Sequence, residues 1–337
     1  IAAIRYVYLH TADAEAFRLR VLVLGTGKRA ASLINLRART DQQGFTIAGF
    51  VDGGDSHQID SNRVLKANGP LVQIAAEHQV DEIVVATDDR RKGLPVRELL
   101  DCRLAGIPVT GDLSFYERQS GKVRLDLLYP SWLIFSDGFN LGTGQRVVKR
   151  LFDVFAASVL VVLSWPVTLI AALAILIEDG APVLYRQERS GFEGKIFKVL
   201  KFRSMCVDAE ENGAQWAEEN DTRITKVGRV LRKYRIDELP QLFNVLKGEM
   251  SFVGPRPERP EFVRELSQTI PYYRERQCAK PGITGWAQLC YRYGASEDDA
   301  AEKLQYDLFY VKNSSVLFDM MILLQTAEVV LIGEGAR

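Results

Sequence analysis

The sequence predicts an α/β protein in two parts. The first part is an N-terminal Rossmann-like domain with a parallel sheet, and the second is a mostly helical α+β monotopic membrane domain with a re-entrant helix hairpin. Apolar strands alternate with helical stretches over residues 20–111, which is typical of a parallel, doubly wound sheet. Residues 154–177 then contain 24 residues without a charge, enough to enter a bilayer. Beyond them the sequence becomes dense in arginine, lysine and carboxylate side chains.

The composition is that of an ordinary folded chain, and it excludes several classes of function. A length of 337 residues suggests about two domains, each with its own core. The 43 basic and 43 acidic residues balance, which argues against a generic nucleic-acid binder. Four cysteines form no CxxC pair, so neither a zinc site nor a disulfide framework is indicated. All three histidines lie at or before His78, so triads and His-ligated metals are excluded from the rest of the chain.

Residues 20–51 have the pattern of strand, glycine turn, helix and strand. The turn carries Gly25-x-Gly27-x-x-Ala30, and Asp52 closes the second strand, where a ribose hydroxyl could be held. Two interpretations remain open: a nucleotide on the helix N-terminus, or a Rossmann-like scaffold with an empty or regulatory pocket. The Tyr-x-x-x-Lys pattern of short-chain dehydrogenases occurs nowhere in the chain, and this favours the scaffold.

The apolar segment 154–177 is predicted to bend rather than to cross the membrane. Pro166 lies close to its middle, where proline deletes a backbone hydrogen bond and kinks the helix, and Ser164 could bond back to a freed carbonyl. Each half of the segment would be about 18 Å long, little more than half of a ~30 Å hydrocarbon core. The alternatives are a straight span and a buried core helix.

The charges that flank this segment also favour a re-entrant hairpin. Lysine and arginine excess marks the cytoplasmic side of a membrane segment, and here both flanks are basic. The basic residues are Arg146, Lys149 and Arg150 before the segment, and Arg186, Arg189, Lys195, Lys198 and Lys201 after it.

Residues 184–205 predict strand, turn and strand, with Lys201 and Arg203 near the end. A run of basic residues at a spacing of three follows. Its members are Arg223, Lys226, Arg229, Arg232 and Arg235. At this spacing they form one helical stripe, suited to an anionic membrane surface or to a phosphate-bearing substrate. A solvated charged face is the alternative interpretation.

A pair of carboxylates, Asp237 and Glu238, comes directly after the stripe. Pro240 is tolerated only in the first turn of a helix, which predicts that a helix starts here with Asp237 at its N-cap. The helix N-terminus would then keep Asp237 ionised and nucleophilic. Adjacent carboxylates beneath arginines suit phosphate and Mg²⁺ chemistry, since a carboxylate can form an acyl phosphate. A purely structural N-cap is the alternative.

The remaining candidates lie in three short stretches downstream. Arg256 stands between two prolines, which present it on a stiff backbone, unless this is only a polyproline spacer. Gly282 and Gly285 allow backbone amides to approach a phosphate, although an ordinary turn explains them equally well, and Gln288 could contact a sugar or nucleotide. A helix near residues 315–332 is interrupted by polar residues and is expected to be core or interfacial.

These motifs, taken in order, closely resemble the monotopic phosphoglycosyl transferases of the bacterial sugar transferase family. The resemblance covers about residues 146–337. It depends on the apolar hairpin and on KFRSM, RIDELPQLFNVLKGEMSFVGPRP, KPGITGWAQ and YDLFYVKNSS. The Rossmann-like module ahead resembles the long form of the family, which carries a four-helix membrane bundle before it. The implied organisation is residues 1–18 as the end of a membrane region or linker, 19–140 as the Rossmann-like domain and 146–337 as the catalytic domain, with the re-entrant helix at 151–178.

The resemblance implies a two-step transfer of sugar 1-phosphate from a UDP-sugar to undecaprenyl phosphate. Asp237 would attack the β-phosphorus and release UMP, and the lipid phosphate would then attack the aspartyl-phosphosugar. Asp237 and Glu238 form the implied catalytic pair and hold Mg²⁺. The residues expected to bind phosphate or substrate are Lys201, Arg203, Arg232, Arg256, Gln288 and Asp307. One departure concerns the bend: the family commonly has Ser-Pro there, whereas this chain has Trp165-Pro166.

The expected setting is the bacterial inner membrane, with the catalytic domain on its cytoplasmic face. The reaction would be the first membrane step of exopolysaccharide, O-antigen or capsule synthesis, with UDP-glucose the first expected donor and UDP-galactose the second. No nucleic acid is expected as a partner, and homodimerisation is left open. Two alternatives are a soluble NAD(P)-dependent nucleotide-sugar dehydrogenase or epimerase, and a non-catalytic membrane scaffold. The first leaves the apolar segment unexplained, and the second would leave Asp237 replaceable.

Overall fold

The computed structural model describes residues 18–34, 36, 44–54, 58–65, 69–89, 94–128, 138–139, 142–206, 222–291, 294 and 296–332. The chain divides into two compact units, residues 1–127 and 128–337, and each is considered by itself. The predicted segment 1–18 lies almost wholly outside the described residues.

The N-terminal unit contains the predicted parallel sheet. Its strands are β1 (Leu19–Leu24), β2 (Phe45–Val51), β3 (Glu82–Val85) and β4 (Val109–Gly111), in the order β2-β1-β3-β4 and all parallel. Its helices are α2 (Lys28–Ile34), α3 (Leu71–Glu77), α4 (Val96–Leu104) and α5 (Asp112–Ser120), with 3₁₀ turns η1 (Ser61–Arg63) and η2 (Leu125–Leu127). Residues of β1 enter apolar cores on both faces of the sheet, as expected of a central parallel strand. The Rossmann-like prediction is confirmed at this level.

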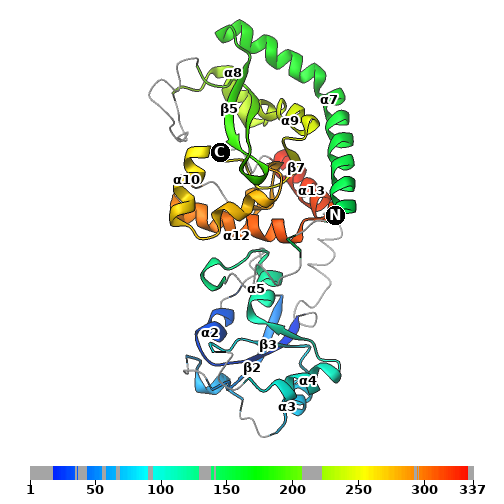
Figure 1. Ribbon diagram of the computed structural model, residues 1–337, viewed down its shortest axis with the longest axis vertical. Coiled ribbons are helices and arrows are strands. Elements are labelled where there is room, and N and C mark those ends of the chain that lie inside the picture. The colour runs from blue at the N-terminus through cyan, green and yellow to red at the C-terminus, as the bar shows by residue number, and fades with distance from the viewer. Residues whose placement is uncertain are drawn as a thin grey trace. The chain divides into compact units, whose positions relative to one another are not determined.

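The C-terminal unit is mostly helical, with two small sheets (Figure 1). β5 (Leu184–Ser190) and β6 (Ile196–Phe202) form the predicted antiparallel pair, and β7 (Ser251–Val253) pairs in parallel with β8 (Gly282–Thr284). The helices are α7 (Thr143–Asp179), α8 (Lys226–Lys233), α9 (Gln241–Lys247), α10 (Pro260–Thr269), α11 (Trp286–Cys290), α12 (Glu297–Asn313) and α13 (Val316–Ile332). The 3₁₀ turns are η3 (Phe192–Gly194), η4 (Ile236–Glu238) and η5 (Tyr273–Cys278).

The core of this unit gathers side chains from α7, β6, α9, β7 and α11–α13. Met250, Val253 and Tyr310 are almost completely buried in it. Trp286 and Phe318 pack edge to face beside them, with ring centroids 5.3 Å apart. This core holds β6, which carries Lys201, and β7, which precedes the segment of Arg256.

Helix α7 contains the apolar segment, and it is one continuous helix rather than two arms separated by a break. Pro166 lies inside it, and Figure 1 shows that the helix changes direction along its course. The predicted back-bond from Ser164 is absent: its Oγ has no hydrogen-bond partner among the described residues. Instead the Thr168 hydroxyl donates to the carbonyl of Trp165, at 2.8 Å. A re-entrant hairpin is therefore not visible as such.

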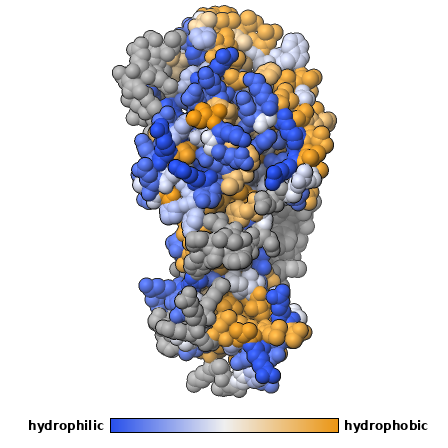
Figure 2. Space-filling model, viewed as in Figure 1, coloured by the Kyte–Doolittle hydropathy of each residue, from blue (hydrophilic) through white to orange (hydrophobic). Residues whose placement is uncertain are grey.

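The apolar side chains of α7 face outward. The helix is long and apolar enough to cross a membrane, and only 11% of its most apolar 18-residue window is buried. Phe155 and Ile177, near the two ends of the segment, are 70% and 85% exposed. Figure 2 shows hydrophobic side chains along the edge of the C-terminal unit where α7 runs. Because water-facing helices do not normally present such a surface, it fits contact with lipid rather than with solvent.

Polar contacts tie both ends of α7 to the same folded unit. Near its start, Lys149 pairs with the buried Asp319 of α13, and Asp153 accepts hydrogen bonds from the Ser251 hydroxyl and the Phe252 amide at 3.0 and 3.1 Å. At its end, Glu178 accepts from the Lys226 and Val227 amides of α8, both at 2.9 Å.

Candidate active site

Asp237 and Glu238 lie in the 3₁₀ turn η4, not at the cap of a helix. Helix α9 begins at Gln241, and Pro240 occupies its N-cap position. The predicted N-cap role of Asp237 is therefore wrong, because a separate turn precedes the proline. Arg235 enters this turn with φ of 57°, a left-handed conformation that is uncommon for arginine. Both carboxylate residues are buried, at 7% and 8% exposure.

Glu238 is the point on which three cations converge. Its Oε1 lies 3.2 Å from Lys201 Nζ, 3.4 Å from Arg256 Nη2 and 3.8 Å from Arg235 Nη1. Burial works to raise the pKa of Glu238, but the charges of Lys201, Arg256 and Arg235 outweigh it and lower the pKa to about 2. Burial in turn lowers the pKa of Lys201, against the opposing effect of Glu238. Glu238 is thus ionised and holds the positive side chains in place.

Asp237 has the opposite environment. Its Oδ1 is buried and has no hydrogen-bond partner in the part of the chain that the structure describes. Burial and then the neighbouring charge of Glu238 raise the pKa of Asp237, while Lys201, Arg232 and Arg235 lower it. This direction is contrary to the prediction that a helix N-terminus would favour the ionised form, since that helix end is not there. An oxygen that is desolvated and unpartnered is a strong nucleophile or ligand once it is ionised.

The predicted basic stripe is shorter than expected. Helix α8 spans only Lys226–Lys233, so Arg223 and Arg235 lie outside it. Arg232 is half-buried, and its Nε donates to the Ser204 hydroxyl at 2.9 Å. Its charge lowers the pKa of Asp237. The other cations of α8 are exposed, as in a solvated or membrane-facing surface.

Arg203 does not join this cluster. Its side chain is buried against the end of α7, where Nη2 donates to the carbonyls of Asp179 and Gly180 at 2.8 and 2.7 Å. It satisfies carbonyl groups that a helix C-terminus leaves unpaired. The phosphate-binding role predicted for Arg203 is therefore not supported by this geometry.

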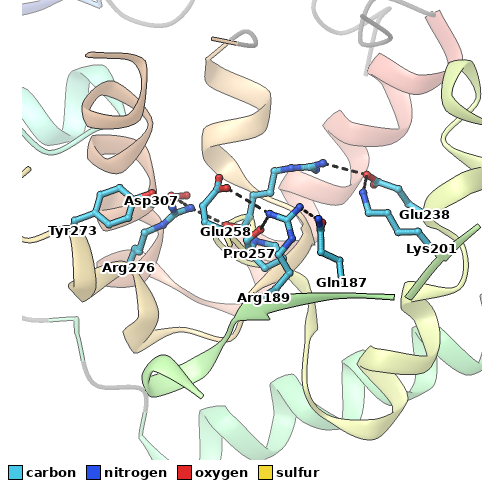
Figure 3. A network of polar contacts seen from close by, with 10 residues as sticks. Gln187, Arg189, Lys201, Glu238, Pro257, Glu258, Tyr273, Arg276 and Asp307 are labelled. Atoms are coloured by element: carbon cyan, nitrogen blue, oxygen red, sulfur yellow. Dashed lines mark hydrogen bonds and ion pairs between the residues drawn. The ribbon is translucent and has the colours of Figure 1, made fainter. Parts of the chain in front are cut away.

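Gln288 and Asp307 lie in different surroundings. Gln288 belongs to α11, and its Oε1 is buried without a hydrogen-bond partner among the described residues. Asp307 of α12 is 2% exposed and forms an ion pair with Arg276 at 2.7 Å. Burial raises the pKa of Asp307 to about 6, although Arg276 opposes this. A polar network connects Asp307 and Arg276 with the region of Glu238 and Lys201 (Figure 3).

Several residues of this network were not predicted from the sequence. Arg276 donates to the Arg256 carbonyl, and Arg189 donates to the Pro257 carbonyl and pairs with Glu258. In the sequence, Arg189 stands out only as part of a basic flank, and Arg276 lies in an arginine- and glutamate-rich stretch without a spacing that sets it apart. The local signal for these contacts is the pair of prolines beside Arg256. A segment with few amide hydrogens cannot pair with itself, so its carbonyl groups need donors from elsewhere in the chain.

The glycine turn of the N-terminal unit is occupied by the protein's own carboxylate. Gly25 has φ of 129°, and a Cβ at Gly27 would lie 2.1 Å from an Asp88 oxygen. Asp88 accepts hydrogen bonds from the Lys28 and Arg29 amides, both at 3.0 Å, at the start of α2 where a pyrophosphate would otherwise lie. Asp52 accepts from the Gly54 amide at 2.9 Å. This geometry favours the scaffold interpretation over dinucleotide binding.

The carboxylate pair also fits the Mg²⁺ that the resemblance implies, provided that substrate oxygens complete the site. Among the described residues, no group of three or more His, Cys, Asp or Glu side chains could hold a metal. Mg²⁺ is usually bound by one or two carboxylates together with substrate phosphates and water. The unpartnered Oδ1 of Asp237 is the oxygen best placed to serve, because Oε1 of Glu238 already faces three cations.

The chain belongs to the bacterial sugar transferase family, whose model matches residues 144–333. It is 42% identical over 74% of its length to a UDP-N-acetylgalactosamine-undecaprenyl-phosphate N-acetylgalactosaminephosphotransferase of Aeromonas hydrophila, of which 58% is covered. It is 33% identical over 91% of its length to a UDP-glucose:undecaprenyl-phosphate glucose-1-phosphate transferase of Klebsiella pneumoniae, with 66% covered. An undecaprenyl-phosphate galactose phosphotransferase of Salmonella typhimurium is 29% identical over 95% of the chain, with 70% covered. The chain thus spans about three fifths to two thirds of the length of these relatives.

Proposed function

We propose that this protein transfers sugar 1-phosphate from a UDP-sugar to undecaprenyl phosphate, through a covalent intermediate on Asp237. The observation that carries the proposal is the buried, unpartnered oxygen of Asp237 beside a cluster of cations. Family membership supplies the reaction class, and the names of the Aeromonas and Klebsiella relatives give a UDP-sugar and undecaprenyl phosphate as their substrates.

In the first step an ionised Asp237 oxygen attacks the β-phosphorus of the UDP-sugar. The bond from that phosphorus to the bridging oxygen breaks, and UMP leaves with the electron pair. In the second step an oxygen of undecaprenyl phosphate attacks the same phosphorus, and the acyl-phosphate bond breaks. The products are undecaprenyl-diphosphate-sugar and the free carboxylate, so Asp237 is regenerated.

The cations would stabilise negative charge in both steps. Lys201 and Arg256 reach Glu238 from separate elements, and Arg232 contributes its charge to Asp237. Donors that are already held in place stabilise a phosphoryl transition state without reorganisation at the moment of reaction. Mg²⁺, when bound by Asp237 and Glu238 with the donor diphosphate, would supply further charge neutralisation.

We further propose that α7 is re-entrant, with both ends on the cytoplasmic face of the inner membrane. The polar contacts of Lys149, Asp153 and Glu178 support this, because they attach both ends of the apolar stretch to one folded unit. A straight span would put one set of these contacts on the far side of a ~30 Å hydrocarbon core. Thr168 and Pro166 provide a reason for the change of direction.

The donor is expected to be a UDP-hexose or a UDP-N-acetylhexosamine. UDP-glucose and UDP-galactose remain the first and second expectations, and the Aeromonas relative adds UDP-N-acetylgalactosamine. The lipid product would initiate a surface polysaccharide.

The reaction is tested with the purified protein in detergent, Mg²⁺, undecaprenyl phosphate and each of these three donors. We expect UMP release with at least one donor, and loss of release by more than about 10³-fold in Asp237→Asn, as for removal of other enzymatic nucleophiles. Glu261→Gln, an exposed carboxylate change on α10, is the matched control and should leave the rate unchanged. Undiminished turnover in Asp237→Asn would exclude this residue as the nucleophile.

The topology is tested by cysteine labelling of intact cells and of inverted membrane vesicles. Single cysteines at Gln145 and Lys198, exposed positions on either side of the apolar stretch, are introduced after the exposed Cys206 and Cys278 are replaced by serine. Both new cysteines should react with an impermeant reagent only in inverted vesicles. A label on position 198 in intact cells would establish a transmembrane span instead.

A further inference from the structure

The backbone that carries Arg256 is held by groups from several other elements. Pro255 and Pro257 have no amide hydrogen, so this segment cannot form a regular ladder of its own. Its carbonyl oxygens instead accept hydrogen bonds from other elements. The Val253 carbonyl accepts from the Tyr310 hydroxyl at 2.8 Å, and the Pro255 and Glu258 carbonyls accept from the amides of Gly282 and Ser190 at 3.0 and 2.9 Å. The Arg256 carbonyl accepts from the Arg276 side chain at 2.9 Å, and the Pro257 carbonyl accepts from the Arg189 side chain at 3.2 Å. Two of these donors are arginine side chains.

Arg276 is the more enclosed of the two arginines. It is 8% exposed, and its Nη1 donates to the Tyr273 hydroxyl at 2.7 Å. Its Nη2 serves both the Arg256 carbonyl at 2.9 Å and Asp307 Oδ2 at 2.7 Å. Each contact uses the fixed planar fork of a guanidinium, which a lysine cannot reproduce. Figure 3 shows Arg276 between Tyr273 and Asp307.

Both members of the Arg276–Asp307 pair are buried. The cavity lined by Arg256, Glu258 and Arg276 has a volume of about 20 Å³, which holds about one water molecule and no phosphate. Asp307 is 2% exposed. The family resemblance implied that Asp307 binds phosphate or substrate, but its burial against Arg276 indicates an indirect role.

We propose that Arg276, fixed by Asp307, is a positioning residue that holds the backbone of Arg256 so that the Arg256 guanidinium meets Glu238 and the donor diphosphate. The inference rests on the proposed function, because it assigns Arg256 to the reacting phosphates. Little conformational entropy is lost when the donor binds, because the prolines already stiffen the segment and Arg276 already fixes its direction. A displacement of about 1 Å at such a group can cost on the order of 10²-fold in rate.

A double-mutant cycle separates positioning from general stabilisation. The variants are Arg276→Lys, Arg256→Ala and the combination, with Arg274→Lys as the matched control, an exposed arginine of the same 3₁₀ turn. UMP release is measured as kcat and KM in detergent, together with the melting temperature. Arg276→Lys should lower kcat on the order of 10²-fold while most of the protein remains folded. In the Arg256→Ala background the same change should lower kcat less than about twofold, because the residue through which it acts is gone.

An equal effect of Arg276→Lys in both backgrounds would overturn the inference, as would a loss that merely follows the folded fraction. If Arg276→Lys does not fold, Arg189→Lys takes its place in the same cycle, since Arg189 holds the next carbonyl. Absence of UMP release by the wild-type protein with every donor would be a failure of the proposed function instead. In that case the positioning role is tested by amide hydrogen exchange of residues 254–266. Exchange there should be faster in Arg276→Lys than in Arg274→Lys, and equal exchange in the two variants would refute the positioning role.

Discussion

Replacing Glu238 by glutamine removes the negative charge that Lys201, Arg256 and Arg235 share. The pKa of Glu238 is lowered from its ordinary 4.5 to about 2, a difference that corresponds to about 3 kcal/mol at ~1.4 kcal/mol for each pKa unit. Glu238 is only 8% exposed, so screening by solvent reduces this stabilisation only slightly. We therefore expect Glu238→Gln to lower the free energy of unfolding of the C-terminal unit by about 3 kcal/mol at pH 7.

The pH dependence of this difference has a definite sign. Because the pKa of Glu238 is lower in the folded protein than in the unfolded chain, the stabilisation is fully present above pH 4.5 and is lost as the pH falls toward about 2. A protonated glutamic acid and glutamine are both neutral at this position. The unfolding free energies of wild type and variant should therefore converge across this pH range.

The assay is urea unfolding of the purified protein in detergent, followed by tryptophan fluorescence at pH values from 2 to 7. The control is again Glu261→Gln, an exposed carboxylate of α10, which should unfold like the wild type at each pH. Equal midpoints for Glu238→Gln and wild type at pH 7 would refute the reasoning. A difference that stays constant from pH 7 to pH 2 would do so as well, since it would arise from packing rather than charge.

Further expected outcomes concern one residue each. Arg232→Leu should move the acid limb of the pH profile of UMP release to higher pH, because the Arg232 charge lowers the pKa of Asp237, and the profile of kcat/KM checks this. Asp319→Leu should cost about 3 kcal/mol in urea unfolding because it removes the carboxylate that pairs with the charge of the buried Lys149. Gly25→Ala should destabilise the N-terminal unit by about 2 kcal/mol or more, because a Cβ at this positive φ would lie 2.5 Å from a main-chain carbonyl oxygen. Gly54→Ala, with positive φ but no atom within 4 Å of a Cβ, should cost less, and thermal melts of the two variants check the difference.

The parallel sheet and the antiparallel pair β5–β6 were predictable because their signals are local. Apolar runs, turn residues and the spacing of strands and helices predict such elements within a few residues of their observed bounds. The helix cap at Asp237 was not predictable in the same way. Pro240 allowed a helix to start on either side of it, and the left-handed Arg235 that begins the separate turn η4 has no clear local signature.

The sequence by itself determined the family, the apolar helix and the adjacent carboxylates, because each is written in consecutive residues or in a fixed order of motifs. Only the tertiary structure decided which cations face Glu238, since Lys201 and Arg256 come from distant parts of the chain. The tertiary structure also decided that Arg203 contacts the end of α7 and that Asp307 is buried against Arg276. The physical reason is that local propensity acts over a few residues, whereas burial and ion pairing depend on neighbours that the chain brings together only when it folds.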